Sequence, residues 1–105
     1  MPLQRTIQAI AFADIVGYTT MMQADERAAS TALKQYKALI QRLVPEYRGQ
    51  TRQFYGDGCL MTFDTSEQAV RCAQALHLAC IEAQIPARIG GHLGEVVEED
   101  EHIYG

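Results

Sequence analysis

Two aspartates occupy positions where their side chains could act on a ligand. Asp14 follows the largely apolar run 7–13, and Asp57 lies between two glycines in segment 56–58. Carboxylates brought close together repel each other, so such a pair favours a divalent cation. Magnesium takes only one or two carboxylates from a protein and completes its shell with water and phosphate oxygens. The two aspartates are therefore a candidate site for a metal ion bound to phosphate.

The segment after Asp14 could supply the anion-binding part of that site. Gly17 stands where an extended run gives way to a helix, and glycine there lets backbone N–H groups face an anion. The segment is not a Walker motif, because the chain's two lysines, Lys34 and Lys37, lie in the middle of a later helical pattern. Each aspartate also has an ordinary explanation as a turn or cap residue. From these residues alone, a nucleotide–metal site and a purely structural role both remain open.

The elements that must position these residues begin with the run 7–13, which predicts a central strand covered on both faces. A helix follows, with Asp25 as its N-cap and Gly49 as the residue that stops it. Its apolar stripe repeats at three- and four-residue spacing. The stripe contains Ala29, Ala32, Leu33, Tyr36, Leu39, Ile40, Leu43, Val44 and Tyr47.

The second half of the chain begins with a hairpin pattern. Segments 51–55 and 59–63 are rich in aromatic and β-branched residues and flank the Asp57-Gly58 turn, which predicts two paired strands. Thr65 and Gln68 then form a capping-box pattern at the start of the next helix. Pro86 marks the restart of an extended segment, 87–94.

The order strand, helix, hairpin, helix, strand predicts an α+β fold with a ferredoxin-like βαββαβ core. Both helices should pack on one face of the sheet. The first strand should lie beside the hairpin in the centre of the sheet. That arrangement would bring Asp14, at a strand end, close to Asp57 in the hairpin turn.

Composition narrows the class of protein. The 105 residues suit one domain, residues 1–105, and no stretch approaches the roughly 20 apolar residues of a membrane span. The net charge is −4, and no basic stripe of a nucleic-acid-binding protein is visible. We therefore expect a cytoplasmic protein with no nucleic-acid partner and no membrane contact from this segment. The three cysteines have neither disulfide nor zinc spacing and should be buried thiols.

Nearly the whole chain resembles the class III adenylate/guanylate cyclases. Residues 12–19 (FADIVGYT) look like the opening motif of that family, and residues 54–58 (FYGDG) resemble its second metal motif. Residues 69–73 (AVRCA) and 88–96 (RIGGHLGEV) resemble its third helix and the strand that follows. Residues 103–105 (IYG) look like the start of the next motif. The resemblance implies a cyclase domain built on the ferredoxin-like core.

Members of this family cyclise a nucleoside triphosphate and release pyrophosphate. The resemblance implies two Mg²⁺ or Mn²⁺ ions as cofactors, which is two-metal catalysis. By motif match, Asp14 and Asp57 are the catalytic and metal-binding carboxylates, and the carbonyl of Ile15 is a further ligand. The positions matched to phosphate binding are Gly17, Tyr18, Thr19 and Arg88. For Arg88, a surface arginine at a strand end is an equally good interpretation.

Sites of this family form between two subunits, so the resemblance also implies a second cyclase subunit as partner, in a homodimer or a heterodimer. The family's base-selecting lysine, which is glutamate in guanylate-specific members, falls at Gln53 in this chain. Glutamine can both donate and accept hydrogen bonds, so the usual rule for the base fails here. We expect ATP rather than GTP as the substrate.

In the family, further residues for base selection, ribose positioning and transition-state stabilisation follow the part that this chain matches. We therefore expect a truncated N-terminal portion of a cyclase domain, with C-terminal elements missing, that turns over little or nothing alone. The alternative is a catalytically dead cyclase-like module that binds nucleotide or supports dimerisation. A ferredoxin-like regulatory domain without metal is a third possibility.

Overall fold

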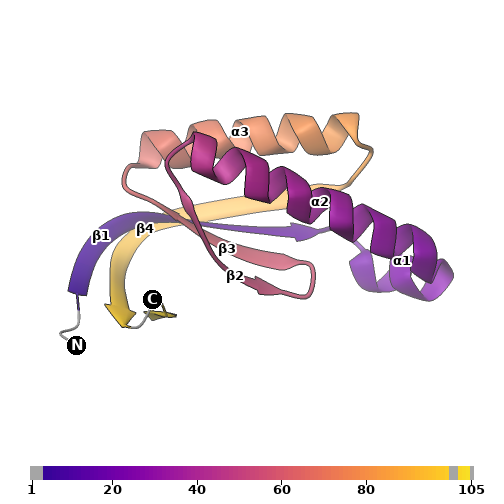
Figure 1. Cartoon of the computed structure of the whole chain (residues 1–105), viewed down its shortest axis with the longest axis horizontal. Coiled ribbons are helices and arrows are strands. Elements are labelled where there is room, and N and C mark those ends of the chain that lie inside the picture. Colours follow the sequence, from indigo (N-terminus) through magenta and orange to yellow (C-terminus); the bar gives the residue numbers. More distant parts are fainter. Residues whose placement is uncertain (1–3, 100–101, 105) are drawn as a thin grey trace.

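An antiparallel sheet with the strand order β2-β3-β1-β4-β5 forms one layer of the molecule, and helices on a single face form the other (Figure 1). The computed structural model describes residues 4–99 and 102–104. The elements in these residues are β1 (Gln4–Ile15), α1 (Tyr18–Ala24), α2 (Glu26–Glu46), β2 (Gln50–Tyr55), β3 (Gly58–Phe63), α3 (Ser66–Glu82), β4 (Ala87–Glu99) and β5 (His102–Tyr104). The predicted βαββαβ order is confirmed, with β5 added at the edge beside β4.

Strand β1 is the central strand, as its apolar run predicted, but it is longer than that run. It pairs with β4 from Gln4↔Glu98 to Ile15↔Ala87, and it pairs with β3 on its other side. Its alanines and Ile15 face the helices and are buried, whereas Phe12 is 47% exposed on the opposite face. The prediction that both faces would be covered is therefore wrong, because the two long helices, α2 and α3, lie on one side of the sheet.

Helix α2 begins where its sequence predicted. The side chain of Asp25 accepts a hydrogen bond from the Ala28 N–H at 3.0 Å, which satisfies a donor that the first turn leaves free. The predicted stop at Gly49 needs correction, because the helix ends at Glu46 and Arg48 takes the left-handed conformation with φ of 60°. Gly49 is needed for a different reason. A Cβ atom there would lie 2.3 Å from the ring of Phe63.

The hairpin and the capping pattern of α3 are confirmed. Strands β2 and β3 pair around the Gly56–Asp57 turn, and the Thr65 side chain accepts a hydrogen bond from the Gln68 N–H at 3.1 Å. The reciprocal half of the capping box is not made, since the side-chain oxygen of Gln68 is buried without a partner in the part of the chain that is described.

The core between the layers contains the three cysteines as free, buried thiols, as predicted. Burial raises the pKa of Cys59 to about 12, an effect that Lys37 partly offsets, and burial and Glu46 raise that of Cys72 to about 11. The thiols therefore stay protonated near neutral pH and act as small apolar side chains. Among the helices that the structure describes, none is long and apolar enough to cross a bilayer.

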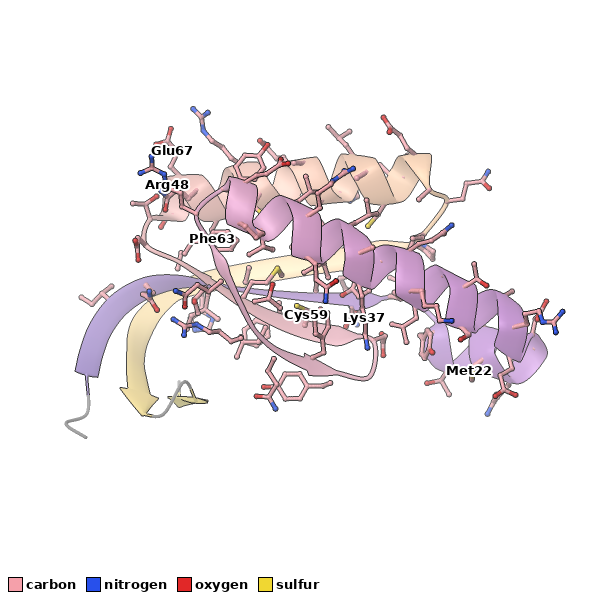
Figure 2. The ribbon with its side chains drawn as sticks, in the orientation of Figure 1. Met22, Lys37, Arg48, Cys59, Phe63 and Glu67 are labelled. Carbon is pink, nitrogen blue, oxygen red and sulfur yellow. The ribbon has the colours of Figure 1, made fainter. Side chains whose placement is uncertain are left out.

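The close approach of Gly49 to Phe63 gives a stability prediction. Figure 2 shows Phe63 beneath the helix layer, near the end of α2 that precedes Arg48. Gly49→Ala should lower the free energy of unfolding by about 1–3 kcal/mol, because the added methyl group overpacks the ring. Urea unfolding measures this. Gly90→Ala is the matched control, since a Cβ atom there meets nothing within 4 Å. Equal stabilities of the two variants would contradict the packing argument.

Candidate metal and phosphate site

The hairpin turn lies against the end of β1. The register Ala13↔Cys59 between β1 and β3 sets the last residues of β1 beside the turn that holds Asp57. The Ile15 N–H donates a hydrogen bond of 3.0 Å to Asp57 Oδ2 in a partly buried position. The expected approach of Asp57 to the end of β1, where Asp14 lies, is therefore observed, between residues 42 positions apart in the sequence.

Asp14 is held by the other neighbour of β1. The register pairs it directly with Arg88 of β4, and Arg88 Nη2 donates to Asp14 Oδ2 at 2.8 Å. This hydrogen bond and the charges of Asp14 and Asp57 raise the pKa of Arg88 above its ordinary value. The second oxygen, Asp14 Oδ1, is buried and has no hydrogen-bond partner among the residues that the structure describes. A buried acceptor without a partner is costly, so this oxygen is suited to a cation that the site would take up.

The carboxylates of Asp14 and Asp57 offer a metal ion only a small set of protein ligands. In the described ranges, no group of three or more His, Cys, Asp or Glu side chains could hold a metal ion. This excludes a closed structural zinc site among those residues. It is compatible with Mg²⁺ or Mn²⁺, since magnesium takes few protein carboxylates and keeps water or phosphate oxygens. The donor set therefore fits a hard divalent cation that arrives with a phosphate ligand.

The anion-binding segment starts immediately after β1. Gly17 precedes α1 with φ of 71°, a conformation that glycine adopts without strain, and a Cβ atom there would meet nothing within 4 Å. The Val16 N–H donates to the Pro86 carbonyl at 2.7 Å, which fastens the segment to the start of β4. Tyr18 packs against the core and Thr19 is exposed. The first N–H groups of α1 have no acceptor within the helix and remain available.

Gln53 lies apart from the carboxylates. It is exposed on β2, and β3 separates β2 from β1 in the sheet. Its side-chain oxygen accepts a hydrogen bond of 3.1 Å from the Tyr55 hydroxyl. The structure therefore brings Asp14, Ile15, Asp57 and Arg88 together, sets residues 17–19 beside them, and leaves Gln53 outside this cluster.

Tyr36 is a residue near the site whose hydroxyl the sequence did not single out. It was predicted as part of the apolar stripe of α2, and it is fully buried. Within residues 4–99 and 102–104 its hydroxyl has no hydrogen-bond partner. Burial, followed by the charges of Cys59, Asp57 and Asp14, raises its pKa well above the ordinary value. The hydroxyl is therefore neutral at any physiological pH. Figure 2 shows Cys59 and Lys37 next to each other, and Lys37 Nζ lies 5.1 Å from the centre of the Phe54 ring.

An apolar cavity of about 300 Å³ lies elsewhere, between α3 and strands β1 and β4. It is lined mainly by small residues, including Ala69, Ala73 and Gly91. None of the predicted site residues lines it. The candidate site is thus the cluster of Asp14, Ile15, Asp57 and Arg88 at the end of β1, and it lies outside this cavity.

The comparisons with known proteins agree with this fold. No protein-family model matches the chain. The chain is 34% identical to "Putative adenylate cyclase 3" of Rhizobium meliloti (strain 1021). The alignment covers 98% of this chain and 19% of that relative. It superposes with a TM-score of 0.88 and 33% identity on an adenylate/guanylate cyclase/hydrolase from Silicibacter pomeroyi, over 99% of this chain and 66% of that one. The guanylyl cyclase Cya2 has the same fold, with a TM-score of 0.82 and 22% identity over 98% of this chain and 64% of that one.

This chain belongs to the class III adenylyl/guanylyl cyclase domain family. It covers less than two thirds of the length of each of these relatives.

The buried hydroxyl of Tyr36, which has no partner among the described residues, gives a prediction about stability. Tyr36→Phe should leave the free energy of unfolding unchanged or raise it by up to about 1–3 kcal/mol, because it removes a buried donor without a partner. Urea unfolding tests this, with the half-buried Tyr47→Phe as a control. A loss of more than about 1 kcal/mol in Tyr36→Phe alone would mean that the hydroxyl has a partner, such as a buried water.

Proposed function

We propose that this chain supplies the metal- and triphosphate-binding part of a nucleotide cyclase site, which converts a nucleoside triphosphate to the 3′,5′-cyclic nucleotide and pyrophosphate. The observation that carries this proposal is the approach of Asp57 to the end of β1, together with a buried oxygen of Asp14 that finds no partner in the described part of the chain. The 34% identity to a protein named as an adenylate cyclase supports the same chemistry.

In this proposal Asp14 and Asp57 hold two Mg²⁺ or Mn²⁺ ions, and the carbonyl of Ile15 adds a ligand. When bound, the ions would help the 3′-hydroxyl of the substrate to lose its proton and would neutralise charge on the phosphates. The protein's contribution is to hold both carboxylates in one orientation. The hydrogen bond from the Ile15 N–H does this for Asp57, and the strand register does it for Asp14.

The terminal phosphates would lie against the start of α1. The N–H groups of Gly17, Tyr18 and Thr19 would donate to phosphate oxygens, as the free amides of a helix start can do. Arg88 would supply a positive charge beside them. Its side chain is 71% exposed, so it can reach a ligand without loss of core packing.

A second cyclase subunit is the proposed partner. The sheet face away from the helices presents Phe12, which stacks on His92 with ring centres 6.1 Å apart, and the exposed Tyr55. Exposed apolar side chains on an open sheet face favour association with another subunit. In a homodimer or heterodimer of this kind, Gln53 would act on the base while the carboxylates act on the phosphates.

ATP is the proposed substrate, because of the hydrogen bond that the Gln53 side chain makes. Its side-chain oxygen is engaged by the Tyr55 hydroxyl, so the amide group presents N–H donors outward. A donor at this position resembles the lysine of adenylate-specific members more than the glutamate of guanylate-specific ones. The product would serve cyclic nucleotide signalling in the cytoplasm.

The metal role is tested by Asp57→Asn. The amide oxygen of asparagine can still accept the Ile15 N–H, so the fold should persist while the negative charge is lost. We expect Mn²⁺-dependent ATP binding, measured by equilibrium dialysis, to weaken by about tenfold or more. Asp64→Asn is the matched control, because Asp64 is an exposed aspartate away from the site, where its side chain accepts a hydrogen bond from Gln8.

ATP binding that does not depend on Mn²⁺, or that Asp57→Asn leaves unchanged, would contradict the metal site. A product assay on the same samples separates an enzyme from a binding module. Cyclic nucleotide and pyrophosphate formed by the wild-type chain, and not by Asp57→Asn, support the cyclase. Mn²⁺-dependent binding without product would favour the catalytically dead module instead.

The choice of base is tested at Gln53 itself. Gln53→Glu should shift the preference of the chain from ATP towards GTP, and Gln53→Lys should strengthen the preference for ATP. Tyr55→Phe should weaken discrimination, because it frees the side-chain oxygen of Gln53 to accept from guanine. Competition between the two nucleotides for the Mn²⁺-loaded chain measures all three variants. An ATP:GTP ratio that none of them changes would remove Gln53 from base selection.

A further inference from the structure

Arg88 forms an ion pair with the carboxylate that the proposed site needs for its cation. The two residues are direct partners in the β1–β4 register, and Arg88 Nη2 lies 2.8 Å from Asp14 Oδ2. A guanidinium this close satisfies one oxygen of Asp14 and neutralises its charge. A divalent cation that approaches Asp14 must therefore compete with Arg88 or share the carboxylate with it.

The pair is placed so that it can separate at low cost. The Arg88 side chain is 71% exposed and that of Asp14 is 35% exposed. Exposed ion pairs are screened by water and contribute little to stability. The planar guanidinium also matches phosphate as well as it matches carboxylate, so it has a second suitable partner in any triphosphate bound next to it.

We propose that Arg88 is a specificity-determining residue that makes the site select a metal–triphosphate complex over a free divalent ion. Without substrate, Arg88 occupies Asp14 and weakens the affinity for the ion alone. When the ion and the triphosphate bind together, the phosphate oxygens accept hydrogen bonds from the Arg88 guanidinium. Both oxygens of Asp14 then become available to the ion. This inference rests on the proposed metal role of Asp14 and Asp57.

The test measures Mn²⁺ binding to the full chain without nucleotide, by the electron paramagnetic resonance signal of free Mn²⁺. Arg88→Gln should bind Mn²⁺ about three- to tenfold more tightly than wild type, because the competing charge is gone. Arg71→Gln is the matched control. It removes the same charge from a similarly exposed arginine, which pairs with Glu67 at 3.1 Å on α3. Arg88→Lys keeps the charge and should remain near wild type.

A second arm adds a 3′-deoxynucleoside triphosphate, which lacks the attacking hydroxyl and cannot cyclise. At saturating Mn²⁺, Arg88→Gln should bind this analogue more weakly than wild type by a comparable factor, while Arg71→Gln should not. Opposite effects of one substitution on the free ion and on the triphosphate are the signature of a residue that changes partner.

Mn²⁺ affinity in Arg88→Gln that is equal to or lower than in wild type would overturn the inference. Asp57→Asn shows which claim has failed. If it weakens Mn²⁺ binding while Arg88→Gln changes nothing, the metal site stands and the selective role of Arg88 is wrong. If Asp57→Asn leaves Mn²⁺ binding unchanged, the proposed metal site is wrong, and the proposed role of Arg88 is then wrong as well.

Discussion

The hydrogen bond from the Ile15 N–H to the Asp57 carboxylate is the interaction on which the candidate site depends. It joins the end of the central strand to the turn of a hairpin that is 42 residues away in the sequence. One oxygen of Asp57 is fixed by this bond, and the backbone that carries Asp14 is fixed by the same strand. Without it, a turn between two glycines would have no reason to hold its side chain in one orientation.

The rest of the fold makes that bond possible. Buried alanines in β1 let the helix layer pack closely on the centre of the sheet, and the β1–β4 pairing extends to Ile15↔Ala87. The bond from the Val16 N–H to the Pro86 carbonyl then fastens the segment that leads into α1. The end of β1, the turn between β2 and β3 and the start of α1 consequently lie at one end of the sheet (Figure 1), where Asp14, Asp57 and the exposed Arg88 are placed.

Features controlled by local chemistry could be predicted from the sequence. The caps at Asp25 and Thr65 each depend on residues three positions apart, and the hairpin at Asp57-Gly58 depends on two short neighbouring segments. All three are confirmed. The meeting of β1 with the hairpin turn followed from the order of elements, which admits few topologies. Residue roles in catalysis and metal binding stay predictions.

Features that depend on distant contacts were not predictable in the same way. Gly49 was interpreted as a helix stop, yet its lack of a side chain is needed by the Phe63 ring, and Arg48 takes the left-handed position instead. The ion pair of Arg88 with Asp14 depends on a register between residues 74 positions apart. Exposure of Phe12 depends on which face the helices cover, and an apolar run does not contain that information.

The most direct measurement of the central claim is the effect of trace Mn²⁺ on the amide signals of the chain in ¹H–¹⁵N spectra. Paramagnetic broadening falls steeply with distance from the bound ion. The account predicts that the amides of Ile15, Gly17 and Asp57 broaden first, while those of Gly49 and Thr65, at the opposite end of β2 and β3, stay sharp. Broadening that is uniform, or that starts at Gly49 and Thr65, would contradict a metal site at the end of β1.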